Sequence, residues 1–278
     1  FRPSAQTVGS PHPHVQHAGV NGGHPYTVYS TWIDGNDDHT SGSPSFPVMG
    51  SQSCHGLGSL FAVFEPQAGL PPAPMPAVMW LHGGGGSYWR YRPSRGPAIE
   101  LDLDVEDGLY VTPDEGLFMN YGGAVVLAGS RWFGTCEDFD RFQDVSTPPA
   151  PGALVVNHQQ IRLNWLMDWL QSDRGADPAR TSLAGLSMGG RGTDMFSRAY
   201  PERLAASLAF VLPIGWSSMG VGIMGDEALN LPTTLPGSPG MHDVIMPYAR
   251  LSSEDVPFGR HIGGTADTIA SWLLRPLV

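Results

Sequence analysis

A serine between two glycines is the strongest chemical signal in the sequence. Residues 185–189 read Gly-Leu-Ser-Met-Gly, so Ser187 has a glycine two positions before it and another two positions after it. A serine hydroxyl is a poor nucleophile unless a base lies within hydrogen-bond reach and the backbone exposes its oxygen. Glycines at these positions permit a sharp strand-to-helix turn with the serine at its tip. The pattern therefore predicts that Ser187 is a catalytic nucleophile rather than part of a chance glycine turn.

A glycine-rich loop gives the second signal. Residues 82–86 read His-Gly-Gly-Gly-Gly and directly follow an apolar run. When a serine attacks an acyl carbon, the carbonyl oxygen becomes negative, and N–H groups of a glycine loop can approach it without a side chain in the way. We expect Met188 to supply one N–H of this oxyanion hole, and Gly83 or Gly84 to supply the other. His82 precedes these donors, so we expect it to hold the loop rather than to act as a base.

Both segments need a parallel sheet to bring them together. Strands are predicted at 26–32, 59–65, 77–81, 124–128, 181–184, 206–212 and 260–264, and the runs at 77–81 and 124–128 are apolar throughout, as in buried parallel strands. Helices are predicted at 154–172, where apolar residues repeat every four positions, and at 188–200, which ends before Pro201. This alternation predicts an α/β fold with a mostly parallel sheet, right-handed crossovers and helices on both faces.

The length and composition favour a single domain over residues 1–278. A chain of 278 residues with 41% hydrophobic content can bury one complete sheet. Residues 1–24 are rich in His, Pro and Gly without apolar periodicity, which predicts an irregular N-terminal arm. Residues 213–255 are loop-like and rich in Gly, Pro and Met, so we expect a variable segment at the substrate-binding face.

The charge and hydropathy argue against several classes of partner. A formal net charge of −11 argues against nucleic-acid binding, which needs a basic face, and no apolar run approaches the roughly 18 residues of a membrane span. The histidines of the first 24 residues are expected to be solvated. The acidic run at 34–38 lacks the distal glutamate of a calcium loop and is expected to be a polar turn. We therefore expect no metal and no cofactor.

Cys54 and Cys136 are the two cysteines of the sequence. They could form a disulfide in an oxidising compartment or remain buried thiols. The sequence starts at Phe1 rather than Met and has no signal-peptide core, so we expect a mature or trimmed product. A secreted or periplasmic location would account for this start, and it favours the disulfide.

Residues 177–193, taken with His-Gly-Gly-Gly at 82–85, resemble the α/β-hydrolase superfamily. They are most similar to the branch that contains secreted esterases, polyhydroxybutyrate depolymerases, feruloyl esterases and prolyl-oligopeptidase-like peptidases. The resemblance spans about residues 78–267 and is most specific around Ser187. The first 60 residues and the stretch at 213–255 resemble no family that we can name.

The resemblance implies a triad in the order Ser, then Asp or Glu, then His. Residues 262–269 are similar to the Gly-x-x-Asp acid turn of the superfamily, which implies that Asp267 orients the histidine. As an alternative, Asp267 caps a helix that begins at Thr268. Asp226 and Asp243 are the reserve candidates for the acid.

The expected histidine is missing from its usual place, because no histidine follows Asp267. His261 lies inside a predicted strand, and His242 lies in the variable segment. We therefore expect a second polypeptide that supplies the last strand and the catalytic histidine. Without that strand, the strand at 260–264 would form an unprotected edge of the sheet.

The expected function is hydrolysis of a small-molecule or polymeric carboxylic ester through an acyl-enzyme. Two alternatives remain, a prolyl-oligopeptidase-like peptidase and a catalytically inactive hydrolase fold used for binding. Trp89, Tyr91, Trp132 and Trp216 lie in or just after loops at the expected active face. They could form a platform for an aromatic or sugar-linked acyl group, or pack only within their loops.

Overall fold

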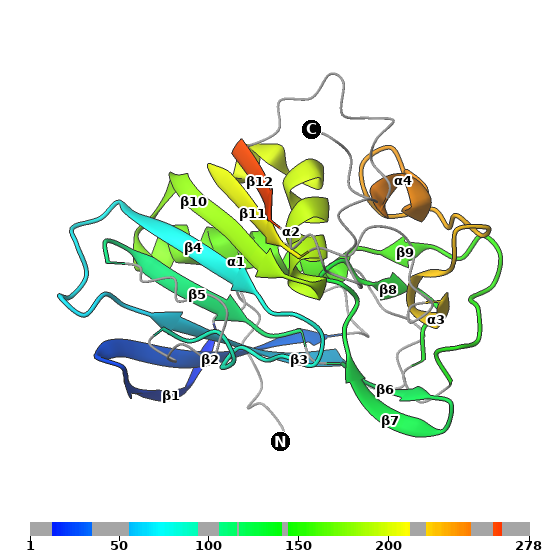
Figure 1. The fold of residues 1–278 in the computed structure, drawn as a ribbon, viewed down its shortest axis with the longest axis horizontal. Helices are drawn as coiled ribbons and strands as arrows, with labels where there is room; N and C mark the ends of the chain where they lie inside the picture. Colours follow the sequence, from blue (N-terminus) through cyan, green and yellow to red (C-terminus); the bar gives the residue numbers. More distant parts are fainter. Residues whose placement is uncertain are drawn as a thin grey trace.

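Eight strands form one mixed sheet through the molecule (Figure 1). The computed structural model describes residues 13–34, 56–93, 106–115, 117–140, 144–211, 221–245 and 258–262. In spatial order the strands are β1 (His14–Asn21), β2 (His24–Asp34), β3 (Gly56–Phe64), β5 (Leu109–Pro113), β4 (Met75–Leu81), β10 (Ala176–Leu186), β11 (Ala206–Phe210) and β12 (Phe258–Ile262). Neighbours from β1 to β5 run antiparallel, and neighbours from β5 to β12 run parallel. The predicted parallel sheet is confirmed for the half that contains β10.

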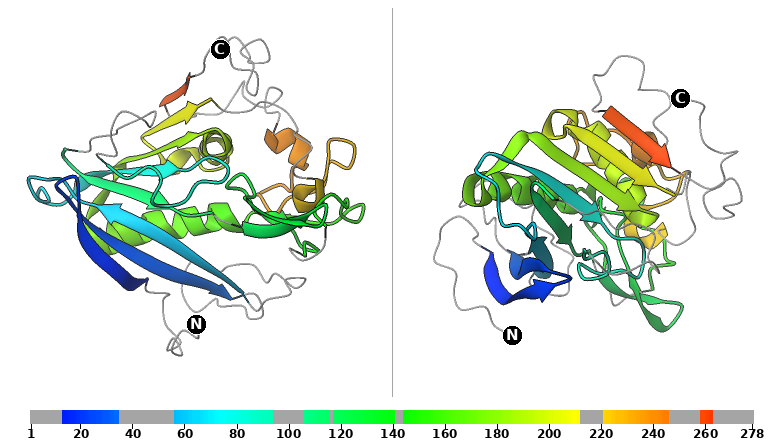
Figure 2. Two further views of the ribbon diagram at one scale, coloured as in Figure 1. Left: turned by 60° about the horizontal axis from the view of Figure 1, so that its bottom comes forward. Right: turned by 60° about the vertical axis from the view of Figure 1, so that its left-hand side comes forward.

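Both long helices pack on the same face of this sheet (Figure 2). They are α1 (His158–Arg174) and α2 (Met188–Ala199), and the short helix η1 (Pro201–Arg203) follows α2. Trp165 of α1 and Phe196 of α2 share one hydrophobic cluster with Met79 and Leu183 of the sheet. The opposite face has its own cluster around Trp80, to which no described helix contributes. The helices expected on that second face have no counterpart among the described residues.

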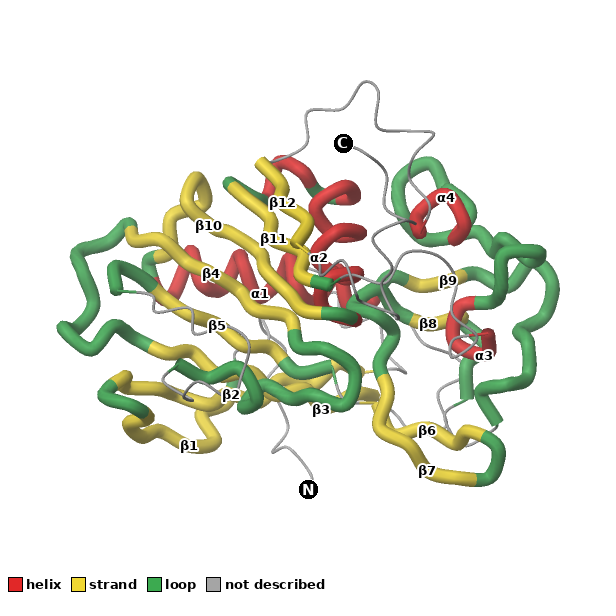
Figure 3. Tube along the Cα trace, in the orientation of Figure 1, coloured by secondary structure: helices red, strands yellow, loops and turns green. Residues whose placement is uncertain are grey.

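The smaller elements lie mostly beyond the carboxyl ends of the parallel strands (Figure 1). They are a hairpin of β6 (Leu117–Tyr121) and β7 (Ala124–Ala128), the pair β8 (Thr135–Cys136) and β9 (Val155–Val156), and the short helices α3 (Val221–Met224) and α4 (Met241–Ile245). Figure 3 shows that loops connect most of them. The described part of the variable segment, residues 221–245, contributes α3 and α4 to this side.

The prediction of an irregular arm over residues 1–24 is wrong for its described part. Residues 14–21 form β1, which pairs antiparallel with β2. Gly22 and Gly23 make the turn between them with φ of 57° and 88°, values that glycine adopts without steric cost. The two-glycine turn was the signal for a hairpin. Residues 1–12 lie outside the described part.

The prediction of a buried parallel strand at 124–128 is also wrong. These residues form β7, which pairs antiparallel with β6 in a separate two-stranded sheet. Gly122 and Gly123 turn the chain between them, again with positive φ. The place next to β4 in the main sheet belongs to β5, which is buried along its whole length and was not predicted.

Among the described helices, none has the length and apolar character needed to cross a membrane.

Candidate active site

Ser187 stands at a sharp turn between β10 and α2. The strand ends at Leu186 and the helix begins at Met188, so the predicted strand, turn and helix are confirmed. Ser187 has φ of 54° and ψ of −112°, a combination that side-chain-bearing residues rarely adopt. Its N–H donates to the carbonyl oxygen of Phe210 at the end of β11, 2.8 Å away. Ser187 directly follows the carboxyl end of β10, and its side chain is half-buried. The hydroxyl therefore lies at the end of the sheet where the parallel strands finish.

The two glycines beside Ser187 are required by close backbone contacts. A Cβ on Gly185 would lie 2.3 Å from the carbonyl oxygen of Gly189, in the first turn of α2. A Cβ on Gly189 would lie 2.0 Å from the carbonyl oxygen of Leu81, at the end of β4. Neither position can hold a larger side chain without moving the backbone. The glycines therefore bring the start of α2 against the loop that follows β4.

This packing places the glycine loop beside the nucleophile. A Cβ on Gly83 would lie 3.5 Å from the Cβ of Ser187. The carbonyl oxygen of Gly83 accepts the N–H of Gly86 at 3.0 Å. Within the described part of the chain, no hydrogen bond uses the N–H of Gly83, Gly84 or Met188. The N–H of Met188 has no partner inside α2, because it belongs to the first residue of the helix.

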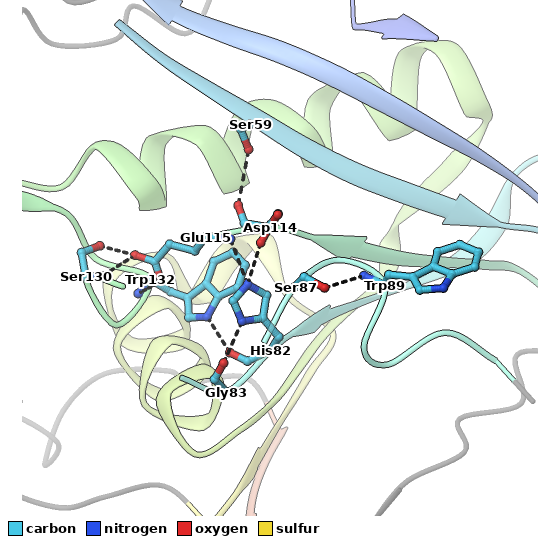
Figure 4. Close-up of polar contacts among 9 residues, drawn as sticks. All are labelled: Ser59, His82, Gly83, Ser87, Trp89, Asp114, Glu115, Ser130 and Trp132. Carbon is cyan, nitrogen blue, oxygen red and sulfur yellow. Dashed lines mark hydrogen bonds and ion pairs between the residues drawn. The ribbon is translucent and has the colours of Figure 1, made fainter. Parts of the chain in front are cut away.

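His82 fixes this loop through both of its ring nitrogens (Figure 4). Its Nδ1 donates to the carbonyl oxygen of Gly83 at 2.8 Å, and its Nε2 accepts the N–H of Glu115 at 2.9 Å. The carboxylate of Asp114 also lies 3.1 Å from Nε2. His82 is only 2% exposed, and both of its ring nitrogens are engaged by these neighbours. These hydrogen bonds confirm the expectation that His82 holds the loop.

Comparison with known proteins identifies the fold. No family model matches the chain. Oligopeptidase B from Trypanosoma brucei has a TM-score of 0.51 and 13% sequence identity, over 89% of this chain and 30% of that one. The chain has the α/β-hydrolase fold. An S-formylglutathione hydrolase from Agrobacterium tumefaciens has a TM-score of 0.49 and 16% identity over 90% of this chain and 91% of that one. The Staphylococcus aureus S-formylglutathione hydrolase has a TM-score of 0.47 and 14% identity over 75% of this chain and 74% of that one.

A buried carboxylate supports the loops of this α/β-hydrolase fold. Glu115 accepts the N–H of Ser130 at 2.8 Å, the hydroxyl of Ser130, and the N–H of Trp132 at 2.7 Å. Burial raises the pKa of Glu115, while the hydrogen bonds from Ser130 and Trp132 act to lower it. The sequence analysis missed this residue, because its partners lie 15 and 17 positions away and no local pattern marks them.

Of the two roles that the sequence left open for Trp132, the structure supports packing within its loop rather than a substrate platform. Its side chain is 0% exposed, and its Nε1 donates to the carbonyl oxygen of His82 at 3.0 Å. Trp89 is half-buried, and its ring contacts the ring of Tyr26, with a centroid distance of 4.9 Å, and the guanidinium of Arg92. In Figure 4, Trp89 lies to one side, away from Gly83. Trp216 lies outside the described residues.

The acid and the base of a triad are not found among the described side chains. Asp267 lies outside the described residues. The reserve candidates make local contacts, since Asp226 accepts the N–H of Leu229 at 2.9 Å and Asp243 lies 4.0 Å from the ring of His242. His242 also pairs with Glu227 at 3.3 Å.

None of the other described histidine side chains forms a hydrogen bond with Ser187. His158 is fully buried in the first turn of α1, and burial lowers its pKa to about 3. His14, His17 and His24 belong to the hairpin of β1 and β2. His261 lies on β12, as expected from its place in a strand, and its side chain is not described. Within the described part of the chain, the hydroxyl of Ser187 has no hydrogen-bond partner.

The predicted disulfide is not formed in the structure. Cys136 is a free thiol with 1% exposure, and Cys54 lies outside the described residues. Burial, with the nearby carboxylates of Asp138 and Glu137, raises the pKa of Cys136 to about 12. Cys136 is therefore a buried thiol, which is the second alternative that the sequence left open.

Proposed function

We propose that this protein is a serine hydrolase that cleaves carboxylic esters through an acyl-enzyme on Ser187. The proposal rests on one observation, that three groups lie side by side in the structure. The strained turn presents Ser187, the start of α2 supplies the N–H of Met188, which makes no hydrogen bond to the described residues, and the glycine loop brings Gly83 beside the serine. Strain of this kind is characteristic of sites where a reactive group must be held in place.

In the proposed reaction, the Ser187 oxygen attacks the acyl carbon of the ester while a histidine takes the hydroxyl proton. The N–H groups of Met188 and of Gly83 or Gly84 stabilise the negative oxygen of the tetrahedral intermediate. The histidine then gives its proton to the departing alcohol, and an acyl-enzyme remains. Water, deprotonated by the same histidine, releases the acid and restores the serine. In this scheme Asp267 orients the histidine.

We also propose that the histidine comes from a second polypeptide. This rests on the described histidine side chains: His82 and His242 contact other groups, His158 is buried, and the others lie in the β1 and β2 hairpin. Mass spectrometry of an active preparation under denaturing conditions should reveal a further polypeptide beside the 29.8 kDa chain. A single species of 29.8 kDa with full esterase activity would contradict this part of the proposal.

Activity assays test the function itself. We expect hydrolysis of p-nitrophenyl acyl esters, with activity on matched peptide p-nitroanilides lower by at least about a hundredfold. Ser187→Ala should abolish both. The control is Ser182→Ala, because Ser182 lies on the same strand and is also half-buried, but it is not at the turn. Preferred cleavage of the anilides would favour the peptidase. No cleavage of either by a preparation that contains both the wild-type chain and the second polypeptide would favour an inactive, binding fold.

A further inference from the structure

One turn of the chain touches both sides of the proposed oxyanion hole. This turn, residues 129–133, follows β7. A Cβ on Gly129 would lie 2.8 Å from the terminal methyl of Met188, so the Met188 side chain packs directly on that glycine. At the other end of the turn, Trp132 Nε1 donates to the carbonyl oxygen of His82. The turn therefore contacts the residue that bears one N–H donor and the peptide group that bears the other.

The conformation of this turn depends on contacts from outside it. Arg131 and Trp132 have φ of 56° and 62°, so two consecutive residues with side chains lie in the left-handed region. Such residues persist only where surrounding contacts hold them. Glu115 supplies these contacts, because its carboxylate accepts the N–H groups on both sides of Arg131 and also the Ser130 hydroxyl. Glu115 is itself 2% exposed, so water does not compete for these hydrogen bonds.

Trp132 lies between the glycine loop and α2. A Cβ on Gly192 of α2 would lie 2.4 Å from the Cβ of Trp132, so the helix has no room for a side chain there. The Trp132 ring also meets the ring of His82 edge to face, with centroids 5.0 Å apart. Trp132 is therefore confined on both sides, and its Nε1 is directed at the His82 carbonyl oxygen (Figure 4).

The Trp132 hydrogen bond sets the direction of the Gly83 N–H. In a trans peptide the C=O and the next N–H point in opposite directions. The His82 carbonyl points at Trp132, so the N–H of Gly83 points away from it. A rotation of this peptide would turn the N–H of Gly83 by the same angle. We propose that Glu115 is a positioning residue of the oxyanion hole, which acts through Trp132 to hold the Gly83 N–H in the direction of the negative oxygen. This inference rests on the function proposed above.

Two variants test the chain of contacts at separate points. Glu115→Gln keeps the shape of the side chain but replaces one accepting oxygen with an NH₂ group, which cannot accept the N–H of Ser130 or Trp132. Trp132→Phe keeps an aromatic ring but lacks the donor to His82. The matched control is Glu137→Gln, because the exposed carboxylate of Glu137 also accepts a backbone N–H, that of Leu154 at 3.1 Å. Glu137 is not part of the contacts described here.

We expect both test variants to lower kcat for ester hydrolysis by about 10- to 100-fold, since loss of a complete oxyanion donor costs about 100- to 1000-fold. KM should stay within about twofold, because the ground-state ester carries no negative oxygen. Affinity for a trifluoromethyl ketone, which forms a tetrahedral oxyanion on the serine, should fall by about the same factor as kcat/KM. Glu137→Gln should match the wild type in all three measurements.

A merely structural role predicts a different result. In that case the variants would lose thermal stability, but the folded fraction would keep the kcat and the ketone affinity of the wild type. That result would overturn the proposal. Should Glu115→Gln not fold, Trp132→Phe decides alone, and an unchanged kcat in that variant overturns the proposal. Failure of the underlying function is distinguishable, because the wild-type chain, assayed together with the second polypeptide, would then hydrolyse no ester, and Ser187→Ala would bind the ketone as well as the wild type.

Discussion

Gly189 and Leu81 touch backbone to backbone: a Cβ on Gly189 would lie 2.0 Å from the carbonyl oxygen of Leu81. This contact joins the first turn of α2 to the end of β4, and so joins the nucleophile to the glycine loop. We expect Gly189→Ala to force the two elements apart and to lower both the Tm and the esterase activity strongly. The control for stability is Gly84→Ala, because a Cβ on Gly84 meets nothing within 4 Å. A Gly189→Ala protein with the Tm of the wild type would show that this contact is not required.

The backbone of Ser187 predicts a conflict between stability and activity. Its φ of 54° and ψ of −112° suit glycine and strain other residues. Ser187→Gly should therefore be more stable than Ser187→Ala by about 1–3 kcal/mol, although both are inactive. Urea unfolding of the two variants measures this difference directly. An alanine variant as stable as the glycine variant would mean that the turn is not strained.

His158 predicts how stability depends on pH. Burial, and then the charge of Arg162, lower its pKa from 6.5 to about 3 in the folded protein. Between these values the unfolded chain binds the proton more strongly, so stability falls as the pH is lowered from 6.5 towards 3. This one group contributes up to about 1.4 kcal/mol per pH unit. The loss of stability between pH 7 and 4.5, measured in urea, should be smaller in His158→Gln. Equal losses in both proteins would place the pKa of His158 near its ordinary value.

Cys136 should be unreactive while the protein is folded. A pKa of about 12, raised mainly by burial, leaves the thiol protonated at pH 8. In a Cys54→Ser background, Cys136 is the remaining cysteine. We expect negligible reaction with a disulfide reagent at pH 8 in buffer and complete reaction in urea. Rapid labelling of the native protein would show that the thiol is accessible.

The nucleophile could be predicted because its geometry depends on neighbours in the sequence. Both glycines that Ser187 needs lie within two positions of it, and the apolar strand before it and the helix after it are local patterns as well. The glycine loop after β4 was predictable for the same reason. His82 could be assigned to holding that loop from its position before the donors.

The contacts of Glu115 and Trp132 that hold the glycine loop could not be predicted in this way. Glu115 lies two residues after β5, and it meets Ser130 and Trp132 only because the end of β5 and the turn at 129–133 converge in three dimensions. Trp132 looked like a loop aromatic in the sequence, and only the packing against Gly192 shows that it is enclosed. The antiparallel pairing of β7 was missed although Gly122 and Gly123 marked a turn, because an apolar run alone does not reveal which strand pairs with it.

The most direct test is to identify the residue that a fluorophosphonate modifies in an active preparation. Trypsin cleaves after Arg180 and Arg191, so Ser187 falls in the peptide 181–191 together with Ser182. We predict that fragmentation of this peptide places the phosphonyl group on Ser187, that labelling abolishes ester hydrolysis in proportion, and that urea-unfolded protein is not labelled. A label on Ser182 or on any other residue, or ester hydrolysis that survives complete labelling of Ser187, would contradict the assignment of Ser187 as the nucleophile.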